Sequence, residues 1–304
     1  MIDATVAAFT AVQAWLFESA VQPLLYTMGL MSFQEPAYEA TEWFLLGVVQ
    51  VVLLALLLRP LEALYPAERW ADRRGTRIDV LYTLLQRLGL VPLVMFVVLT
   101  PVVEQLAEWQ RAAGFTPFNL EGLWPGVTDV PLVSFLLYLV VLDFVDYWLH
   151  RAQHRHDWWW ALHALHHSQQ QMSFWADDRN HLLDDFIMDA ANAAVALAIG
   201  VEPWQFVLLI VVTRVIESLQ HANVRTALGP VGRVIVSPLF HRRHHAIGVG
   251  HEGVHRGCNF AVLFPAWDVL FGTADLSSTV EPTGIRDQLP PPAGAQRDYG
   301  RGFW

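Results

Sequence analysis

The sequence contains a single cysteine, Cys258, among its 304 residues. One thiol cannot form an internal disulfide framework, and it cannot supply the several sulfur ligands of a cysteine-bound zinc or iron–sulfur site. Charged side chains are also scarce, at 16% of the chain, whereas hydrophobic residues make up 54%. This composition excludes an ordinary soluble protein and indicates a membrane protein.

Basic residues are absent from residues 1–58, and the first ones crowd into the short segment 59–77, where five arginines occur. Because no broad basic face follows elsewhere, the sequence argues against nucleic acid as a partner. The N-terminus also lacks the basic region of a signal peptide. Positively charged loops stay in the cytoplasm, so we expect residues 59–77 inside the cell and the N-terminus outside.

The hydrophobic pattern predicts an all-α, multi-pass membrane fold. Residues 4–31 predict an interfacial helix, because polar residues interrupt their apolar run. The apolar segment 43–58 is nearly long enough to cross a hydrocarbon core of about 30 Å. Residues 80–103 are expected to return across the membrane into an acidic external loop at 104–129. Residues 1–129 would thus form an N-terminal membrane region.

A catalytic region is expected over residues 130–276. Residues 130–149 predict a helix that returns to the cytoplasm. The apolar runs 186–199 and 204–219 predict a helical hairpin, since each is shorter than the roughly 20 residues needed to span a membrane. Residues 277–304 are rich in proline, glycine and polar residues, which predicts an extended or disordered tail.

Histidine is the residue whose spacing stands out. The pattern H-x-x-H-H occurs at 163–167 and again at 241–245. On a helix, residues three and four apart share a face, so these imidazoles converge. Each strong group follows the cytoplasmic end of an apolar segment, which predicts a histidine-rich cap at one membrane face. The candidate metal ligands are His150, His154, His163, His166, His167, His221, His241, His244 and His245.

This set is too large for one tetrahedral zinc, but it suits two metals. Imidazole binds iron, zinc and copper alike. Two carboxylates precede ligand candidates by one helical turn: Asp146 before His150, and Glu217 before His221. That repeated spacing predicts that they orient these histidines from behind. Residues 158–160 are tryptophans, which predict an interfacial anchor.

Together these residues form a pattern that resembles the fatty acid hydroxylase / sterol desaturase superfamily. The resemblance covers roughly residues 138–274 and includes the nine histidines together with further motif residues. These are Asn223, Ser237-Pro238, Asn259, Trp267-Asp268 and Phe271-Gly272-Thr273. Between His245 and Asn259 the chain departs from the usual short polar loop and has a glycine-rich segment instead.

The resemblance implies a helical membrane protein whose cytosolic histidines hold two iron ions, with zinc as a possible substitute on purification. It also implies O2-dependent hydroxylation or desaturation of an unactivated C–H bond in a lipid taken from the bilayer. Because no electron-carrying domain is attached, electrons would come from an external partner such as a ferredoxin or a cytochrome and its reductase. His181 matches a recurring family position and joins the candidate ligands, while Asn259 joins Asp146 and Glu217 as a candidate catalytic residue.

Other functions remain open at this point. The string His251-Glu252-Gly-Val-His255 fits the zinc protease pattern H-E-x-x-H, although the glycines around it disfavour the helix that this chemistry needs. A zinc-dependent membrane hydrolase could also use the main histidine cluster. A membrane carrier of metal or haem is the non-enzymatic alternative. The sequence identifies neither the lipid nor the carbon that would be oxidised.

Overall fold

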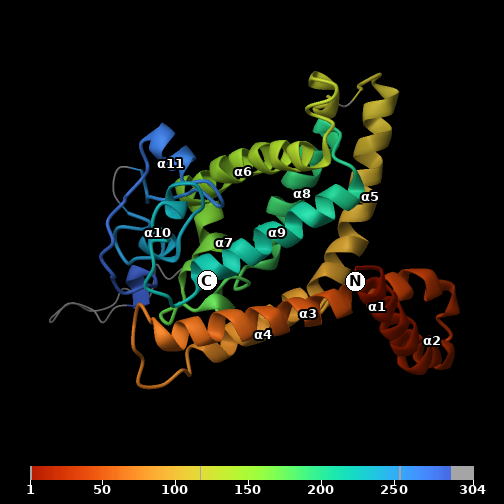
Figure 1. Ribbon diagram of the computed structural model, residues 1–304, viewed down its shortest axis with the longest axis horizontal. Coiled ribbons are helices and arrows are strands. Elements are labelled where there is room, and N and C mark those ends of the chain that lie inside the picture. The colour runs from red at the N-terminus through yellow and green to blue at the C-terminus, as the bar shows by residue number, and fades with distance from the viewer. Residues whose placement is uncertain (1, 117, 253–254, 289–304) are drawn as a thin grey trace.

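The computed structural model describes residues 2–116, 118–252 and 255–288. These residues form eleven α-helices and no strand beyond two isolated bridges, which confirms the all-helical prediction. The helices are α1 (Ile2–Leu16), α2 (Gln22–Thr27), α3 (Gln34–Leu64), α4 (Thr76–Arg87), α5 (Leu90–Ala112), α6 (Pro131–Arg155), α7 (Asp157–His167), α8 (Leu182–Ile199), α9 (Pro203–His221), α10 (Pro238–His244) and α11 (Ala266–Phe271). Figure 1 shows α10 and α11 at one side of the molecule, where α6 ends, and α1 and α2 at the opposite side.

Two stretches of the described chain are long and apolar enough to cross a membrane, Met31–Leu64 and Pro131–Arg155. The first contains α3, whose leucines Leu56 and Leu57 are 66% and 64% exposed. So many exposed aliphatic side chains on one helix indicate a surface that meets lipid rather than water. The two stretches indicate membrane association.

The segment 80–103 is not the single helix that the sequence predicted. It is divided between α4 and α5, because Gly89 adopts a left-handed conformation with φ 88°. A neighbouring contact also requires glycine: a Cβ atom on Gly47 of α3 would lie 1.7 Å from the carbonyl oxygen of Arg87. The end of α4 therefore packs directly against the backbone of α3.

Helices α6, α8 and α9 build the central core of the molecule. Tyr138, Leu139 and Leu142 of α6 pack against Ala196 of α8 and Leu209 of α9. The two apolar runs predicted as a hairpin form separate helices: Gly200 ends α8 in a left-handed turn, and a capping box at Glu202 and Gln205 starts α9. The pair runs alongside α6, so the C-terminal ends of α6 and α9 reach the same side of the molecule (Figure 1).

A cap of short helices and loops covers those two ends. It contains α7, α10 and α11, and α10 begins at Ser237, whose hydroxyl accepts a hydrogen bond from the Phe240 amide. Residues 277–288, predicted as part of a tail, are extended but pack back on the cap: Ile247 N–H donates to the Pro282 carbonyl, and Gly284 N–H donates to the His245 carbonyl. The rest of the predicted tail, residues 289–304, lies outside the described residues.

Candidate metal centre

Nine buried histidines meet inside the cap and form two adjacent groups. Within each group, the candidate ligand atoms lie within 4.8 Å of one another. The larger group, called group A here, consists of His150, His154, His163, His167 and His244. The smaller one, group B, consists of His166, His221, His241 and His245.

Helical spacing explains how the two H-x-x-H-H motifs are divided. On α7, His163 and His167 are four residues apart and enter group A, while His166 enters group B. On α10 and its C-cap the assignment is reversed: His241 and His245 enter group B, and His244 enters group A. Each motif therefore contributes to both groups, because positions four apart share a face and the position between them is rotated away.

The remaining ligands come from the ends of the two long core helices. His150 and His154 lie four residues apart in the last turns of α6, and His221 is the last residue of α9. Because α6 and α9 end at the same side of the molecule, residues 71 positions apart in sequence are delivered to neighbouring groups. The core packing of α6 against α9 is thus what holds the two groups together.

In group A, the second ring nitrogen of four histidines is held by an oxygen atom. The Nδ1 atom of His150 lies 2.8 Å from the Phe260 carbonyl, that of His154 3.2 Å from Arg256, and that of His244 2.8 Å from Cys258. A carbonyl oxygen can only accept, so each Nδ1 carries the proton and each Nε2 keeps a free lone pair.

His163 follows the same rule with a carboxylate in place of a carbonyl. Its Nδ1 lies 3.0 Å from Asp184, which also accepts from Gln153 and from the indole of Trp159. Burial alone would raise the pKa of Asp184, but the hydrogen bonds from His163, Gln153 and Trp159 keep that pKa below its usual value. Asp184 is therefore an ionised carboxylate that fixes the orientation and the tautomer of His163.

The Nε2 atoms that result are buried and have no hydrogen-bond partner among the described residues. This holds for His150, His154, His163 and His244, and for both ring nitrogens of His167. A buried nitrogen without a partner is costly, and several that converge on one point are rare in a protein interior. Their arrangement fits a metal ion bound through Nε2 lone pairs.

In group B, the Nε2 atoms face one another directly. The distances are 3.2 Å from His166 to His221, 3.1 Å from His221 to His241, and 3.1 Å from His241 to His245. The Nδ1 of His221 is held from behind, 2.8 Å from the Glu217 backbone carbonyl. Lone pairs that meet in this way suit a common cation, so group B fits a second metal ion.

Burial and the neighbouring imidazoles hold the pKa values of His167, His244 and His245 well below the ordinary 6.5. These rings are consequently neutral at physiological pH, which is the form that binds metals. An all-imidazole donor set suits iron, zinc or copper. The structure therefore supports metal binding by both groups.

The two carboxylates that were predicted to orient histidines do not contact them. Asp146 accepts a hydrogen bond from Asn192 at 2.7 Å, while His150 uses the Phe260 carbonyl. Glu217 reaches His221 through its backbone carbonyl rather than through its carboxylate. Helical spacing placed them on the correct face, but a main-chain carbonyl lies closer to each ring: that of Phe260 in the cap for His150, and that of Glu217 in α9 for His221.

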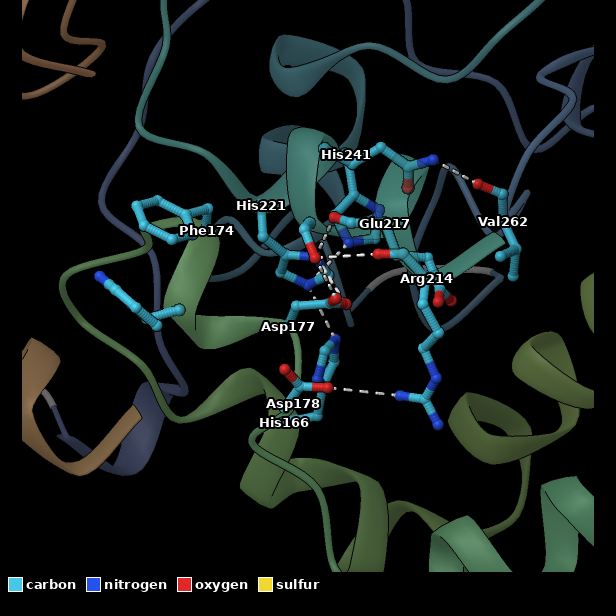
Figure 2. Close-up of polar contacts among 12 residues, drawn as sticks. His166, Phe174, Asp177, Asp178, Arg214, Glu217, His221, His241 and Val262 are labelled. Carbon is cyan, nitrogen blue, oxygen red and sulfur yellow. Dashed lines mark hydrogen bonds and ion pairs between the residues drawn. The ribbon is translucent and has the colours of Figure 1, made fainter. Parts of the chain in front are cut away.

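The carboxylate beside His221 is instead Asp177, whose Oδ1 lies 3.4 Å from Nδ1 of that ring. Figure 2 shows Asp177 near His221, with Asp178 next to it and Arg214 directed at Asp178. Asp177 and Asp184 were both missed by sequence reasoning. The available signal was the pair of Asp-Asp dipeptides at 177–178 and 184–185 in the polar segment that follows the first histidine motif.

Asn259 and His181 lie away from the converging nitrogens. Asn259 is fully buried with φ 57°, and its amide donates to the carbonyls of Phe240 and Asp275. It thereby fixes the irregular segment whose carbonyls, on Cys258 and Phe260, hold His244 and His150. His181 is exposed and caps α8 by accepting from the Leu183 amide, so the structure does not bring it to either group.

The predicted interfacial tryptophans divide between two roles. Trp158 is exposed, as an anchor would be, but Trp159 is buried and its indole donates to Asp184. The ring of Trp160 lies 4.9 Å from that of His154 and stacks at 5.1 Å on His251. Only Trp158 therefore has the exposure that the anchor prediction requires.

The protease-like string does not form a zinc site in the described part of the loop. Glu252 makes a bidentate ion pair with Arg286, at 2.6 Å for both contacts, and His255 is exposed. The described residues of this loop form turns, whereas the H-E-x-x-H chemistry needs a helix.

The N-terminal helices reach this centre through buried polar contacts. Glu62 of α3 accepts hydrogen bonds from the amides of Phe174 and Asn223. Arg87 of α4 donates to Asp178 at 2.6 Å and to Asp177 at 2.8 Å. Since Asp177 lies against His221, the N-terminal region takes part in holding group B.

A cavity of about 190 Å³ lies between α6, α8 and α9 and opens on both histidine groups. Its apolar wall includes Leu139, Phe206, Leu209 and Ile210. His150 and His163 of group A, and three histidines of group B, line the other end. The apolar wall of a pocket beside buried candidate ligands can hold a hydrocarbon chain next to the metals.

A helical chain with two buried groups of imidazoles at the ends of apolar helices defines a class of histidine-ligated, membrane-associated metal proteins. Residues 135–273 match the model of the family "Fatty acid hydroxylase", so this part of the chain is a fatty acid hydroxylase domain and the predicted resemblance is confirmed. No solved structure matches the chain.

Curated relatives point to the same chemistry. The chain is 28% identical over 263 residues to an ornithine lipid hydroxylase of Rhizobium tropici, which covers 84% of this chain and 76% of that protein. It is 26% identical over 149 residues to an alkylglycerol monooxygenase of Caenorhabditis elegans, covering 49% and 28%. It is 24% identical over 177 residues to a very-long-chain aldehyde decarbonylase of Oryza sativa subsp. japonica, covering 53% and 26%. These similarities identify an oxidoreductase of the lipid hydroxylase type.

Proposed function

We propose that this protein hydroxylates a C–H bond of a membrane lipid, using O2 and two iron ions held by groups A and B. The observation that carries the proposal is the pair of buried imidazole groups, with Nε2 atoms left without partners, inside a fatty acid hydroxylase domain. In the balanced reaction, one oxygen atom of O2 enters the C–H bond and the other leaves as water. Two electrons and two protons complete it.

The residues of the chain bind and position, while bound iron supplies the activation of O2 that no side chain can provide. Burial keeps the imidazoles neutral, while the carbonyls and Asp184 hold their orientation. The apolar wall at Phe206 and Leu209 would align the lipid chain and exclude water. Electrons would arrive from an external partner, either a ferredoxin or a cytochrome and its reductase.

We place the histidine-rich cap on the cytoplasmic face and the N-terminus outside. The apolar stretches Met31–Leu64 and Pro131–Arg155 would both enter the bilayer in a multi-pass arrangement. The arginine-containing segment 59–77 follows α3 on the side of the cap, and an antiparallel bridge between Pro66 and Val224 joins the two. This placement agrees with the preference of positive loops for the cytoplasm.

Metal analysis of the detergent-purified protein tests the two-iron centre. We expect about two irons per chain after expression with iron, about one in His154→Ala and about one in His166→Ala, since each variant damages one group. His156→Ala is the matched control, because His156 is exposed and belongs to neither group. Iron that is unchanged in both group variants would refute the assignment of the ligands.

An oxygen requirement tests the reaction. With a bacterial lipid extract and a reductase system, we expect an alcohol product whose added oxygen derives from labelled O2. Product formation that continues without O2, in a protein that holds zinc, would instead identify a hydrolase and refute the proposed function.

A further inference from the structure

The cavity beside the metal centre carries an excess of acidic side chains. Several acids that line it already have partners: Asp143 accepts from two amides and an indole, and Asp184 accepts from three side chains. Asp177 accepts from Arg87 and Ser218, and Asp185 accepts from Gln86. The remaining carboxylates are Asp146, whose one donor, Asn192, also lines the cavity, and Asp189 and Glu217. They come from α6, α8 and α9, and we call these three the acid wall. Asp189 and Glu217 have no side-chain hydrogen bond among the described residues.

Among the described residues that line the cavity, Arg214 is the one guanidinium, and it lies one turn before Glu217 on α9. Its ion pair is with Asp178, at 3.6 Å (Figure 2). A single guanidinium that is shared with Asp178 cannot pair with three further carboxylates.

The side chain of Gln220 is a second, independent observation, because its oxygen also has no hydrogen-bond donor among the described residues. Gln220 lines the cavity and is 1% exposed, and its amide nitrogen donates to the Val262 carbonyl at 2.7 Å. That carbonyl can only accept, so the amide cannot be turned around. Among the described residues, the Oε1 atom therefore has no partner, and neither has Oδ1 of Asn192, whose nitrogen donates to Asp146.

The acid wall does not have the geometry of a further metal site. Among the described residues, the groups of ligand atoms close enough to share one ion are the two histidine groups, and no carboxylate belongs to them. Carboxylates that are spread over three helices suit a larger cation with several N–H donors. A primary ammonium has three such donors and no acceptor.

We propose that the acid wall and Gln220 bind a primary ammonium group in the headgroup of the lipid substrate. The assignment rests on the proposed function and narrows its substrate class to aminolipids. Glu217 lies one helical turn before His221, and Asp146 one turn before His150, so the bound ammonium would lie beside both metal groups. A neutral headgroup would leave the half-buried carboxylates of the acid wall and the buried oxygen of Gln220 without a donor, which disfavours its binding.

Equilibrium binding to the iron-loaded protein under anaerobic conditions tests the assignment without requiring turnover. The probes are N-palmitoylputrescine, which carries a primary ammonium, and its N-acetylated form, which has the same chain but no charge. We expect the ammonium lipid to bind at least about tenfold more tightly, as one lost charge-assisted hydrogen bond implies. Equal affinities in tryptophan fluorescence titrations would overturn the proposal.

Variants of Asp189 test whether the acid wall binds the ammonium group. Asp189→Asn removes a carboxylate that contacts no proposed metal ligand, and we expect it to abolish the preference while iron content stays unchanged. Asp189→Glu should restore the preference, and Glu108→Gln is the control, since Glu108 is exposed on α5. A preference that survives in Asp189→Asn would refute the acid wall as its cause. If Asp189→Asn fails to fold, the affinities of the unaltered protein for the ammonium lipid and for its N-acetylated form still test the proposal.

The outcomes separate the two proposals. A clear ammonium preference in a protein that shows no O2-dependent product would support the binding site and count against the hydroxylase. Turnover of neutral and ammonium lipids with equal KM, together with equal affinities, would support the hydroxylase and overturn the acid wall.

Discussion

At the residue scale, the orientation of an imidazole ring depends on the group that accepts a hydrogen bond from its Nδ1 atom. Asp184 holds His163 and is itself held by Gln153 and Trp159. Asp184→Asn would keep the shape but remove the charge, so we expect iron affinity at group A to fall about 10–100-fold. Chelator competition measures this fall. Asp157→Asn is the control, since Asp157 is exposed and contacts Arg256. An unchanged affinity in Asp184→Asn would show that His163 needs no carboxylate.

The lowered histidine pKa values predict how the iron-free protein responds to acid. His167, His244 and His245 titrate near 6.5 when unfolded but well below that in the folded state, mainly because of burial. Below pH 6.5 the unfolded chain therefore binds more protons, and stability falls as pH falls. Each such ring contributes up to about 1.4 kcal/mol per pH unit.

We therefore expect the thermal midpoint of the iron-free protein to drop on going from about pH 7.5 to about pH 5.5. Replacing one of these rings, as in His167→Gln, should make the drop smaller, whereas His156→Ala should leave it unchanged because His156 is exposed. Differential scanning fluorimetry in detergent gives the comparison. A midpoint independent of pH in the unaltered protein would contradict the neutral, buried state of these rings.

At the element scale, α4 is linked to group B through Arg87 and Asp177, although it lies outside the matched family domain. Arg87 is 7% exposed and pairs with Asp177 and Asp178. Removing one partner of a buried ion pair leaves charge uncompensated, so we expect Arg87→Met to lower the free energy of unfolding by about 3–5 kcal/mol. Iron should be lost from group B first, through Asp177 and His221.

Chemical denaturation and iron counting test the role of α4, with Arg77→Met as a control on the same helix because Arg77 is exposed. Loss of stability with equal loss of iron from both groups would mean that Arg87 supports the fold alone. Retention of full stability would contradict the importance of the ion pair.

Part of this site could be predicted from the sequence, and part could not. The nine converging histidines and helices α6, α8 and α9 follow from local spacing, since the face on which a histidine lies depends only on its position in the helix. The partners behind the rings could not be predicted, because the carbonyls that hold His150 and His244 come from an irregular loop at Cys258 and Phe260, and Phe260 lies 110 residues from His150. Local spacing made Asp146 and Glu217 better candidates than Asp177 and Asp184, and tertiary packing reversed that order.

At the scale of the whole molecule, the arrangement of α3, α6 and α9 predicts which surfaces face the same side of the membrane. All three helices end at the cap, so Arg74, after α3, and Arg233, before α10, should share one side. Leu123, in the loop before α6, should lie on the other. The single native cysteine, Cys258, is 8% exposed, so background labelling will be low and Cys258→Ser is the reference.

Single cysteines introduced as Arg74→Cys, Arg233→Cys and Leu123→Cys give a direct reading of this arrangement. All three positions are exposed, so a membrane-impermeant maleimide can reach each from the side that it faces. In inverted vesicles we expect labelling of the first two and protection of the third, and in intact cells with a permeable outer layer the reverse. Labelling of Leu123→Cys together with Arg233→Cys would mean that α6 does not cross the bilayer, and that the cap and the cavity rest on one membrane surface.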